Sequence, residues 1–260
     1  MPATLKPQIT DCLKQLRLPA FVANFSPQAA LVANEGWPYD GYLLNLCNLE
    51  LEEREQRKIK KLQHASRLPR EKTLSAFDRS RLKKAVDRQV SALLEADFLD
   101  RRENVLVFGN PGSGKTHLLC GLGHELIHKG RAVLFTECVL LVQRLLLSKS
   151  ELRLEKELKR LDKYEALIID DIGYVQQSRE EMEVLFTLLA HRYENRSVLL
   201  TSNLAFSQWE KIFKDPMTTA AAIDRLVHHS VILELNLSSY RMETAQKQKR
   251  ELNNLEAQES

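Results

Sequence analysis

One stretch of the chain has a residue pattern suited to binding phosphate groups. Residues 109–116 read Gly-Asn-Pro-Gly-Ser-Gly-Lys-Thr, which fits the pattern G-x-x-x-x-G-K-[ST]. The glycines let the backbone curl so that successive N–H groups converge on phosphates at the start of the next helix. The lysine then reaches the β- and γ-phosphates, and the threonine hydroxyl ligates Mg²⁺. We predict that the following residues bind the phosphates of ATP: Gly109, Asn110, Pro111, Gly112, Ser113, Gly114, Lys115, Thr116 and the adjoining His117.

A second set of candidate residues is a pair of acids after an apolar run. The run covers residues 166–169, and Asp170 and Asp171 follow it. Ligands of parallel sheets bind at the C-terminal ends of the strands. We therefore predict that Asp170, with Thr116, holds the magnesium, and that Asp171 polarises the attacking water. Taken without the phosphate-binding loop, the same pair would more simply cap a helix N-terminus.

A competing metal motif is present at His124-Glu125-Leu126-Ile127-His128, which matches H-E-x-x-H. On a helix this spacing places two imidazoles one turn apart and supplies a glutamate to activate zinc-bound water. However, the motif lies at the far end of the helix that starts at Lys115, and no third ligand follows at the expected spacing. The sequence favours the nucleotide site over a zinc site.

Two further polar residues are candidates for the hydrolytic step. The apolar run 198–201 leads into Asn203, which would orient the water if this strand lies beside that of Asp170. Arg225 lies on an expected helix, from which it could complete the site of a neighbouring subunit. A strand-ending asparagine and a surface salt bridge are the simpler alternatives.

Five short apolar runs must supply the strands that position these residues. They are separated by helix-length segments, which is typical of a parallel sheet covered by helices on both faces. The fold class is therefore α/β with a five-stranded parallel sheet. The five runs cover residues 105–108, 132–136, 166–169, 198–201 and 231–235.

The N-terminal part of the chain reads as a small all-helical unit. Residues 36–41 form an expected turn in which Asp40 caps the next helix. Pro69 interrupts the helical pattern. We predict a helical DNA-binding and oligomerisation domain over residues 1–68 and an ATPase domain over residues 69–260.

Lysine and arginine are concentrated between residues 54 and 88, although the net charge of the chain is only +3. A basic helix with few opposing acids is suited to binding the phosphates of double-stranded DNA. A solvated amphipathic helix face would give the same pattern. The predicted DNA contacts are Arg54, Arg57, Lys58, Lys60 and Lys61.

The remaining composition argues against a membrane protein or a secreted one. No apolar run approaches the roughly 18 residues of a membrane-spanning helix, and the N-terminus lacks a signal-like apolar core. The 4 cysteines show no metal-site or redox spacing, so we expect reduced, mostly buried thiols. A cytoplasmic location is the expectation.

The order of these motifs resembles the initiator and helicase-loader branch of the AAA+ ATPases, and within it the IstB family of transposition helper ATPases. The resemblance extends over about residues 40–245 and includes Leu68-Pro69, Lys72-Thr73-Leu74 and Phe77-Asp78 in the linker. It implies that Asn203 is a first sensor and Arg225 a finger acting on the next subunit. It also implies that Arg241, in Ser239-Tyr240-Arg241, is a second sensor that contacts the nucleotide.

The resemblance further implies an Mg²⁺-dependent ATPase that self-associates with ATP, binds double-stranded DNA, and recruits and activates a transposase. A replicative helicase loader of the DnaC type is the nearest alternative function. A metabolic P-loop kinase is a third, but it would need an acceptor pocket and an arginine-bearing lid that the sequence does not reveal.

Overall fold

The structure is a computed structural model that describes residues 5–174, 178–209, 216–237 and 239. The chain divides into two compact units, residues 1–61 and 62–260. The division falls inside one long helix, α3 (Tyr39–Ser66).

The first unit is helical, as its sequence indicates. It contains α1 (Leu5–Gln15), α2 (Pro19–Glu35) and most of α3. Gly36 ends α2 in the left-handed conformation at φ 69°, which glycine adopts without steric cost. Glu50 is buried and accepts hydrogen bonds from the Ala20 amide and the Arg54 guanidinium, both through its carboxylate. The hydrogen bond from the Ala20 amide ties α3 to the start of α2, whereas the pair with Arg54 lies within α3.

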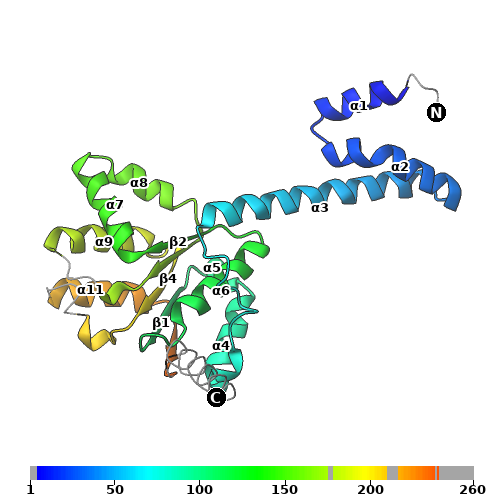
Figure 1. The fold of residues 1–260 in the computed structure, drawn as a ribbon. Coiled ribbons are helices and arrows are strands. Elements are labelled where there is room, and N and C mark those ends of the chain that lie inside the picture. The colour runs from blue at the N-terminus through cyan, green and yellow to red at the C-terminus, as the bar shows by residue number, and fades with distance from the viewer. Residues whose placement is uncertain (1–4, 175–177, 210–215, 238, 240–260) are drawn as a thin grey trace, which may run out of the picture. The chain divides into compact units, whose positions relative to one another are not determined.

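The second unit is built on a parallel sheet of five strands in the order β2-β3-β4-β1-β5 (Figure 1). Paired strands run parallel throughout, with Leu106 opposite both Leu200 and Ile232. β4 thus lies between β1 and β3. The strands are β1 (Asn104–Gly109), β2 (Val133–Glu137), β3 (Ala166–Asp170), β4 (Ser197–Ser202) and β5 (Ser230–Leu235).

Helices cover both faces of this sheet because side chains alternate along each strand. Ile168 meets Gly123 of helix α6 (Lys115–His128), whereas the next residue, Ile169, belongs to the apolar cluster on the other side. That cluster contains buried side chains of α7 (Cys138–Ser150), α8 (Leu154–Leu161), α9 (Arg179–Arg192) and α11 (Pro216–Val227). The unit is therefore a three-layer α/β domain.

Shorter elements complete the second unit. A segment after α3 leads through η1 (Arg79–Arg81) into α4 (Lys84–Leu94) and α5 (Asp97–Asp100). Further short turns, η2 (Ile172–Tyr174) and η3 (Phe206–Gln208), follow β3 and β4. Both lie directly beyond the strand ends at which the candidate acids and Asn203 are found.

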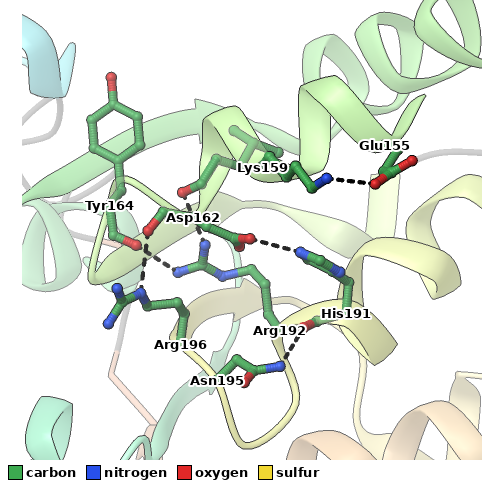
Figure 2. Close-up of polar contacts among 9 residues, drawn as sticks. Glu155, Lys159, Asp162, Tyr164, His191, Arg192, Asn195 and Arg196 are labelled. Atoms are coloured by element: carbon green, nitrogen blue, oxygen red, sulfur yellow. Dashed lines mark hydrogen bonds and ion pairs between the residues drawn. The ribbon is translucent and has the colours of Figure 1, made fainter. Parts of the chain in front are cut away.

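A buried arginine stabilises the end of the sheet that lies away from the candidate acids and Asn203. Arg192 of α9 is fully buried and donates to the carbonyl oxygens of Leu161, Tyr164 and Ser197 at 3.0–3.2 Å. Burial lowers its pKa to about 10, so the side chain stays charged at neutral pH. Figure 2 shows it beside Asp162, which also pairs with His191 at 2.8 Å. These contacts join α8, α9 and the start of β4 away from the candidate site.

The predicted fold class and the five predicted strands are confirmed. Two local expectations are wrong: α3 begins at Tyr39, so Asp40 lies in its first turn instead of capping it, and only two of the four thiols are buried. Cys120 and Cys138 are buried, whereas Cys12 is exposed and Cys47 half-buried. Within the described residues, no helix has the combined length and apolar character needed to cross a membrane.

Candidate nucleotide site

The predicted phosphate-binding residues form a tight loop between β1 and α6. Gly109, Gly112 and Gly114 have φ of 157°, 80° and 93°. The last two values lie where L side chains are strained. A Cβ at Gly112 would also overlap the hydroxyl of Ser239, and one at Gly109 would overlap the Leu235 carbonyl. The loop therefore depends on glycine for its conformation and for the close approach of the chain after β5.

Lys115, the first residue of α6, points back into this loop. Its side chain is buried, at 9% exposure, and its ammonium donates to the carbonyl oxygens of Gly109 at 2.7 Å and Asn110 at 3.0 Å. A buried ammonium needs acceptors or an anion nearby. The loop thus holds a positive charge at the N-terminus of a helix, where anions are favoured.

Thr116 and Asp170 meet directly, although they are far apart in the sequence. The Thr116 hydroxyl donates to Asp170 Oδ1 at 2.8 Å, and the Thr201 hydroxyl donates to the same oxygen at 2.7 Å. Thr201 also accepts the Asp171 amide at 2.7 Å. One hydroxyl on β4 therefore positions both acids beside the phosphate-binding loop.

Asp171 has an unusual backbone and electrostatic setting. Its φ is +64°, in the left-handed region that costs non-glycine residues energy and is found at functional sites. Its pKa is raised, mainly by burial and also by the neighbouring charge of Asp170, while Lys115 opposes the shift. Such a carboxylate is a stronger proton acceptor than an ordinary aspartate, which suits a general base.

Asn203 follows β4, next to the strand of the two acids as predicted. Within the described part of the chain, its Oδ1 and Asp171 Oδ1 are buried and accept no hydrogen bond. A Cβ at Gly173 would overlap Asn203 Oδ1, so a larger residue there would displace the Asn203 amide. Buried polar atoms without partners are costly, and a bound polar ligand would satisfy them.

A cavity opens between the phosphate-binding loop and the linker before α4. Phe77 contacts Gly114 closely enough that a Cβ there would meet its ring. The cavity combines an apolar wall with charged residues, a composition suited to the base and ribose of a nucleotide. Its lining from outside the loop consists of Lys72, Ala76, Phe77, Asp78, Arg81, His117 and Leu237.

The histidines of α6 hold this linker. His117 Nε2 lies 2.9 Å from the Thr73 carbonyl oxygen, and its ring meets Phe77 edge-on. His124 Nε2 lies 3.0 Å from the Pro69 carbonyl oxygen, and His128 Nε2 lies 3.3 Å from Gln63. The two histidines of the H-E-x-x-H motif therefore have separate partners, one in the linker and one at the end of α3, and His117 lines the cavity as a packing residue.

Of the two arginines predicted to act on the nucleotide, Arg225 lies within the described residues and Arg241 does not. Arg225 on α11 donates to the Ala221 carbonyl oxygen at 3.4 Å, and its guanidinium lies 4.7 Å from the ring centre of Phe186 on α9. Neither contact involves the nucleotide site of its own chain. Arg241 lies outside the described residues; Ser239, two positions earlier, packs on Gly112.

The five predicted DNA contacts of α3 fall into two groups. Arg54 pairs with Glu50 at 2.8 Å, and Arg57 pairs with Glu53 at 3.0 Å. Lys58, Lys60 and Lys61 are exposed. The side chains of Arg54 and Arg57 are 53% and 43% exposed, so all five residues are accessible to a partner, although the two arginines also pair within the helix.

Comparison with known proteins identifies the family. The model of the IstB-like ATP binding protein family matches residues 11–249, which is most of the chain. The chain belongs to the IstB-like ATP-binding proteins. An insertion sequence ATP-binding protein of Sinorhizobium fredii is 41% identical over 239 residues, which are 92% of this chain and 80% of that protein. The ATP-binding protein of insertion sequence IS5376 from Geobacillus stearothermophilus is 36% identical over 92% of this chain and 95% of its own length.

Solved structures share the fold of the IstB-like chain over about two thirds of its length. DnaI superposes with a TM-score of 0.54 at 22% identity, over 65% of this chain and 95% of DnaI. The DnaC helicase loader superposes with a TM-score of 0.52 at 18% identity, over 67% and 98% of the two chains. At this identity the likeness concerns the fold alone. The family makes the IstB-like chain an ATP-binding protein, and the solved structures show that its α/β fold is shared with DnaI and DnaC.

Sequence reasoning missed two parts of the IstB-like site. Thr201 had no role assigned from the sequence, and the signal for one was its place on a strand beside Asp170. Phe77 and Asp78 were noticed in the linker, but nothing in their spacing placed them on the cavity wall.

Replacing Thr201 by valine is expected to impair hydrolysis more than nucleotide binding. Valine keeps the shape but removes the hydroxyl that holds Asp170 and the Asp171 amide, leaving a buried donor unpaired. The expected results are a roughly tenfold slower release of phosphate and a loss of about 1–3 kcal/mol in unfolding free energy. Phosphate-release assays and urea unfolding measure them. Thr187→Val, which removes a hydroxyl bonded within α9, is the matched control and should change neither quantity comparably.

Proposed function

We propose that the chain is an Mg²⁺-dependent ATPase that assembles on double-stranded DNA with ATP and recruits a transposase. The direct hydrogen bond between Thr116 and Asp170 carries the enzymatic part of the proposal. Membership in the IstB-like family, with relatives named after insertion sequences, supports the link to transposition.

Residues at the start of α6 and the end of β3 fit a magnesium ion. Mg²⁺ prefers oxygen ligands and is usually bound through one or two protein groups together with substrate phosphates. The Thr116 hydroxyl and the Asp170 carboxylate are oxygen donors that already lie 2.8 Å apart. When bound, the ion would neutralise charge on the phosphates.

Hydrolysis depends on the chain's own residues around this point. Lys115 binds the β- and γ-phosphates, and Asp171 accepts a proton from the attacking water. Asn203 orients that water, which also satisfies the buried Oδ1 atoms of Asn203 and Asp171. Thr201 keeps the two carboxylates in place.

Arg225 is proposed to act on the nucleotide of a neighbouring subunit. In its own chain it lies over Phe186, on a helix surface. Moving the Arg225 guanidinium away from the Phe186 ring would cost on the order of 1 kcal/mol. A charge-assisted hydrogen bond between the guanidinium and a phosphate would be stronger than this. ATP would then link subunits, and loss of the γ-phosphate would loosen the assembly.

Exposed lysines of α3 are proposed to bind DNA phosphates. Replacing Lys58, Lys60 and Lys61 together by alanine should weaken duplex binding and lower the slope of log affinity against log salt by about 0.9 for each lost phosphate contact. Fluorescence anisotropy with a duplex at several salt concentrations measures both effects.

The matched control is Lys159→Ala, which removes an exposed lysine of α8 that lies outside the basic stretch and pairs with Glu155. It should leave the salt slope nearly unchanged. An unaltered slope in the triple-lysine variant would place the DNA contacts elsewhere on the chain.

The choice of partner separates the proposal from a helicase loader. Immobilised chain, loaded with ATP and duplex DNA, is offered the transposase of its own insertion sequence and, separately, the host replicative helicase. We expect ATP-dependent retention of the transposase. Retention of the helicase alone would make the chain a loader.

A further inference from the structure

Three potential metal ligands lie together on the second unit, at the end of the sheet where β4 and β5 begin. They are Glu194, in the turn after α9, and His228 and His229, in the turn between α11 and β5. Their ligand atoms all lie within 4.8 Å of one another, and the three residues are exposed. Neither the nucleotide site nor the proposed DNA contacts uses them.

Hydrogen bonds to the main chain hold the turns that carry these side chains. The Glu194 carbonyl accepts a hydrogen bond from Arg102 at 2.7 Å, and Glu194 has a φ of +57°. The His229 carbonyl accepts the Asn104 amide at 2.7 Å, and the His228 amide donates to the Asp224 carbonyl at 2.9 Å. The ligands therefore project from anchored backbone, so their side chains need only rotate to converge on an ion.

A neighbouring tyrosine fixes one imidazole. The Tyr193 hydroxyl lies 3.1 Å from His228 Nδ1, which leaves His228 Nε2 available. Metal-bound histidines usually have the second ring nitrogen held in this way by an outer hydrogen-bonding group. The rings of His228 and His229 meet edge-on, with centres 4.2 Å apart.

We propose that Glu194, His228 and His229 form a binding site for a zinc-like divalent transition-metal ion. Two imidazoles and one carboxylate are a ligand set that zinc uses, with bonds of about 2.0–2.2 Å. Ligand atoms around such an ion lie roughly 3.4 Å apart, which exposed side chains can reach from the observed spacing by small rotations. A fourth position remains for water or for a side chain of another protein. The ion would join the end of α9 to the turn after α11.

Equilibrium dialysis of untagged protein against zinc chloride, without nucleotide, tests this site. We expect one zinc ion per chain and a rise in the thermal unfolding midpoint when zinc is present. The double variant His228→Ala/His229→Ala should lose this ion, and Tyr193→Phe should bind it about tenfold more weakly. Unchanged ATP affinity in the double variant would show that its nucleotide site is intact.

The control is His128→Ala, which removes one histidine of the H-E-x-x-H motif. It should bind zinc as the unaltered chain does. The proposal is overturned if the unaltered chain binds no zinc, if the double variant retains the ion, or if His128→Ala loses it. Because zinc is measured without ATP or DNA, these outcomes do not depend on the ATPase proposal.

Discussion

Replacing Lys115 by alanine is expected to lower the affinity for ATP roughly 10- to 100-fold, the value of losing one or two charge-assisted hydrogen bonds. The side chain is the buried cation of the phosphate-binding loop and already contacts two loop carbonyl oxygens. Titration with a fluorescent ATP analogue measures the change.

Lys129→Ala is the matched control, because Lys129 lies just after the same helix and pairs on the surface with Glu95 at 3.4 Å. It should bind ATP as the unaltered chain does. Equal ATP affinity in the Lys115 variant would show that the loop does not bind the triphosphate.

Replacing Asp171 by asparagine is expected to slow hydrolysis roughly 10²- to 10⁴-fold, the usual contribution of a general base, while ATP still binds. Asparagine has nearly the same shape and also tolerates the left-handed backbone that Asp171 adopts at φ +64°. Single-turnover hydrolysis and nucleotide titration measure the two effects. A variant that hydrolyses ATP at the original rate would remove Asp171 from the reaction.

The raised pKa of Asp171 gives two further expectations, one for the unaltered chain and one for the asparagine variant. The base must be ionised, so hydrolysis by the unaltered chain should fall as the pH drops through this raised pKa. The folded chain also holds the Asp171 proton more tightly than the unfolded chain does, so ionised Asp171 lowers stability at neutral pH, and this penalty disappears as the pH falls. Asparagine removes the charge, and the thermal unfolding midpoint at neutral pH should therefore stay the same or rise.

The sequence predicted the α/β fold because each strand is a short apolar run and the phosphate-binding loop has a distinctive glycine spacing. It also predicted that Thr116 and Asp170 act at one site, and in the structure the two side chains share a hydrogen bond. Both inferences combine local sequence patterns with the rule that ligands of parallel sheets bind at the C-terminal ends of the strands.

Other features depend on contacts that local patterns do not contain. The role of Thr201 required the strand order, since β4 had to lie between β1 and β3. The cavity wall at Phe77 required the path of the linker over α6, which His117 and His124 help to fix. The basic stretch contains few acids of its own. Glu50 and Glu53 lie just before it, however, and pair with Arg54 and Arg57 one helical turn later, which the count of acids within the stretch does not show.

The roles of Arg225 and Asn203 remain predictions of different kinds. Asn203 lies where a water-orienting group should be, with a buried oxygen that a ligand would satisfy. Arg225 needs a second subunit, so no contact within one chain can test it. The proposed role of Arg225 is therefore tested by whether the chain assembles with ATP.

Sedimentation of the chain with ATP, with ADP and without nucleotide, each with and without duplex DNA, tests the central claim most directly. We predict a large assembly only when ATP and duplex are both present, its dissociation as ATP is hydrolysed, and no assembly by Arg225→Ala under the same conditions. A sedimentation coefficient that does not respond to ATP on duplex DNA would contradict the account.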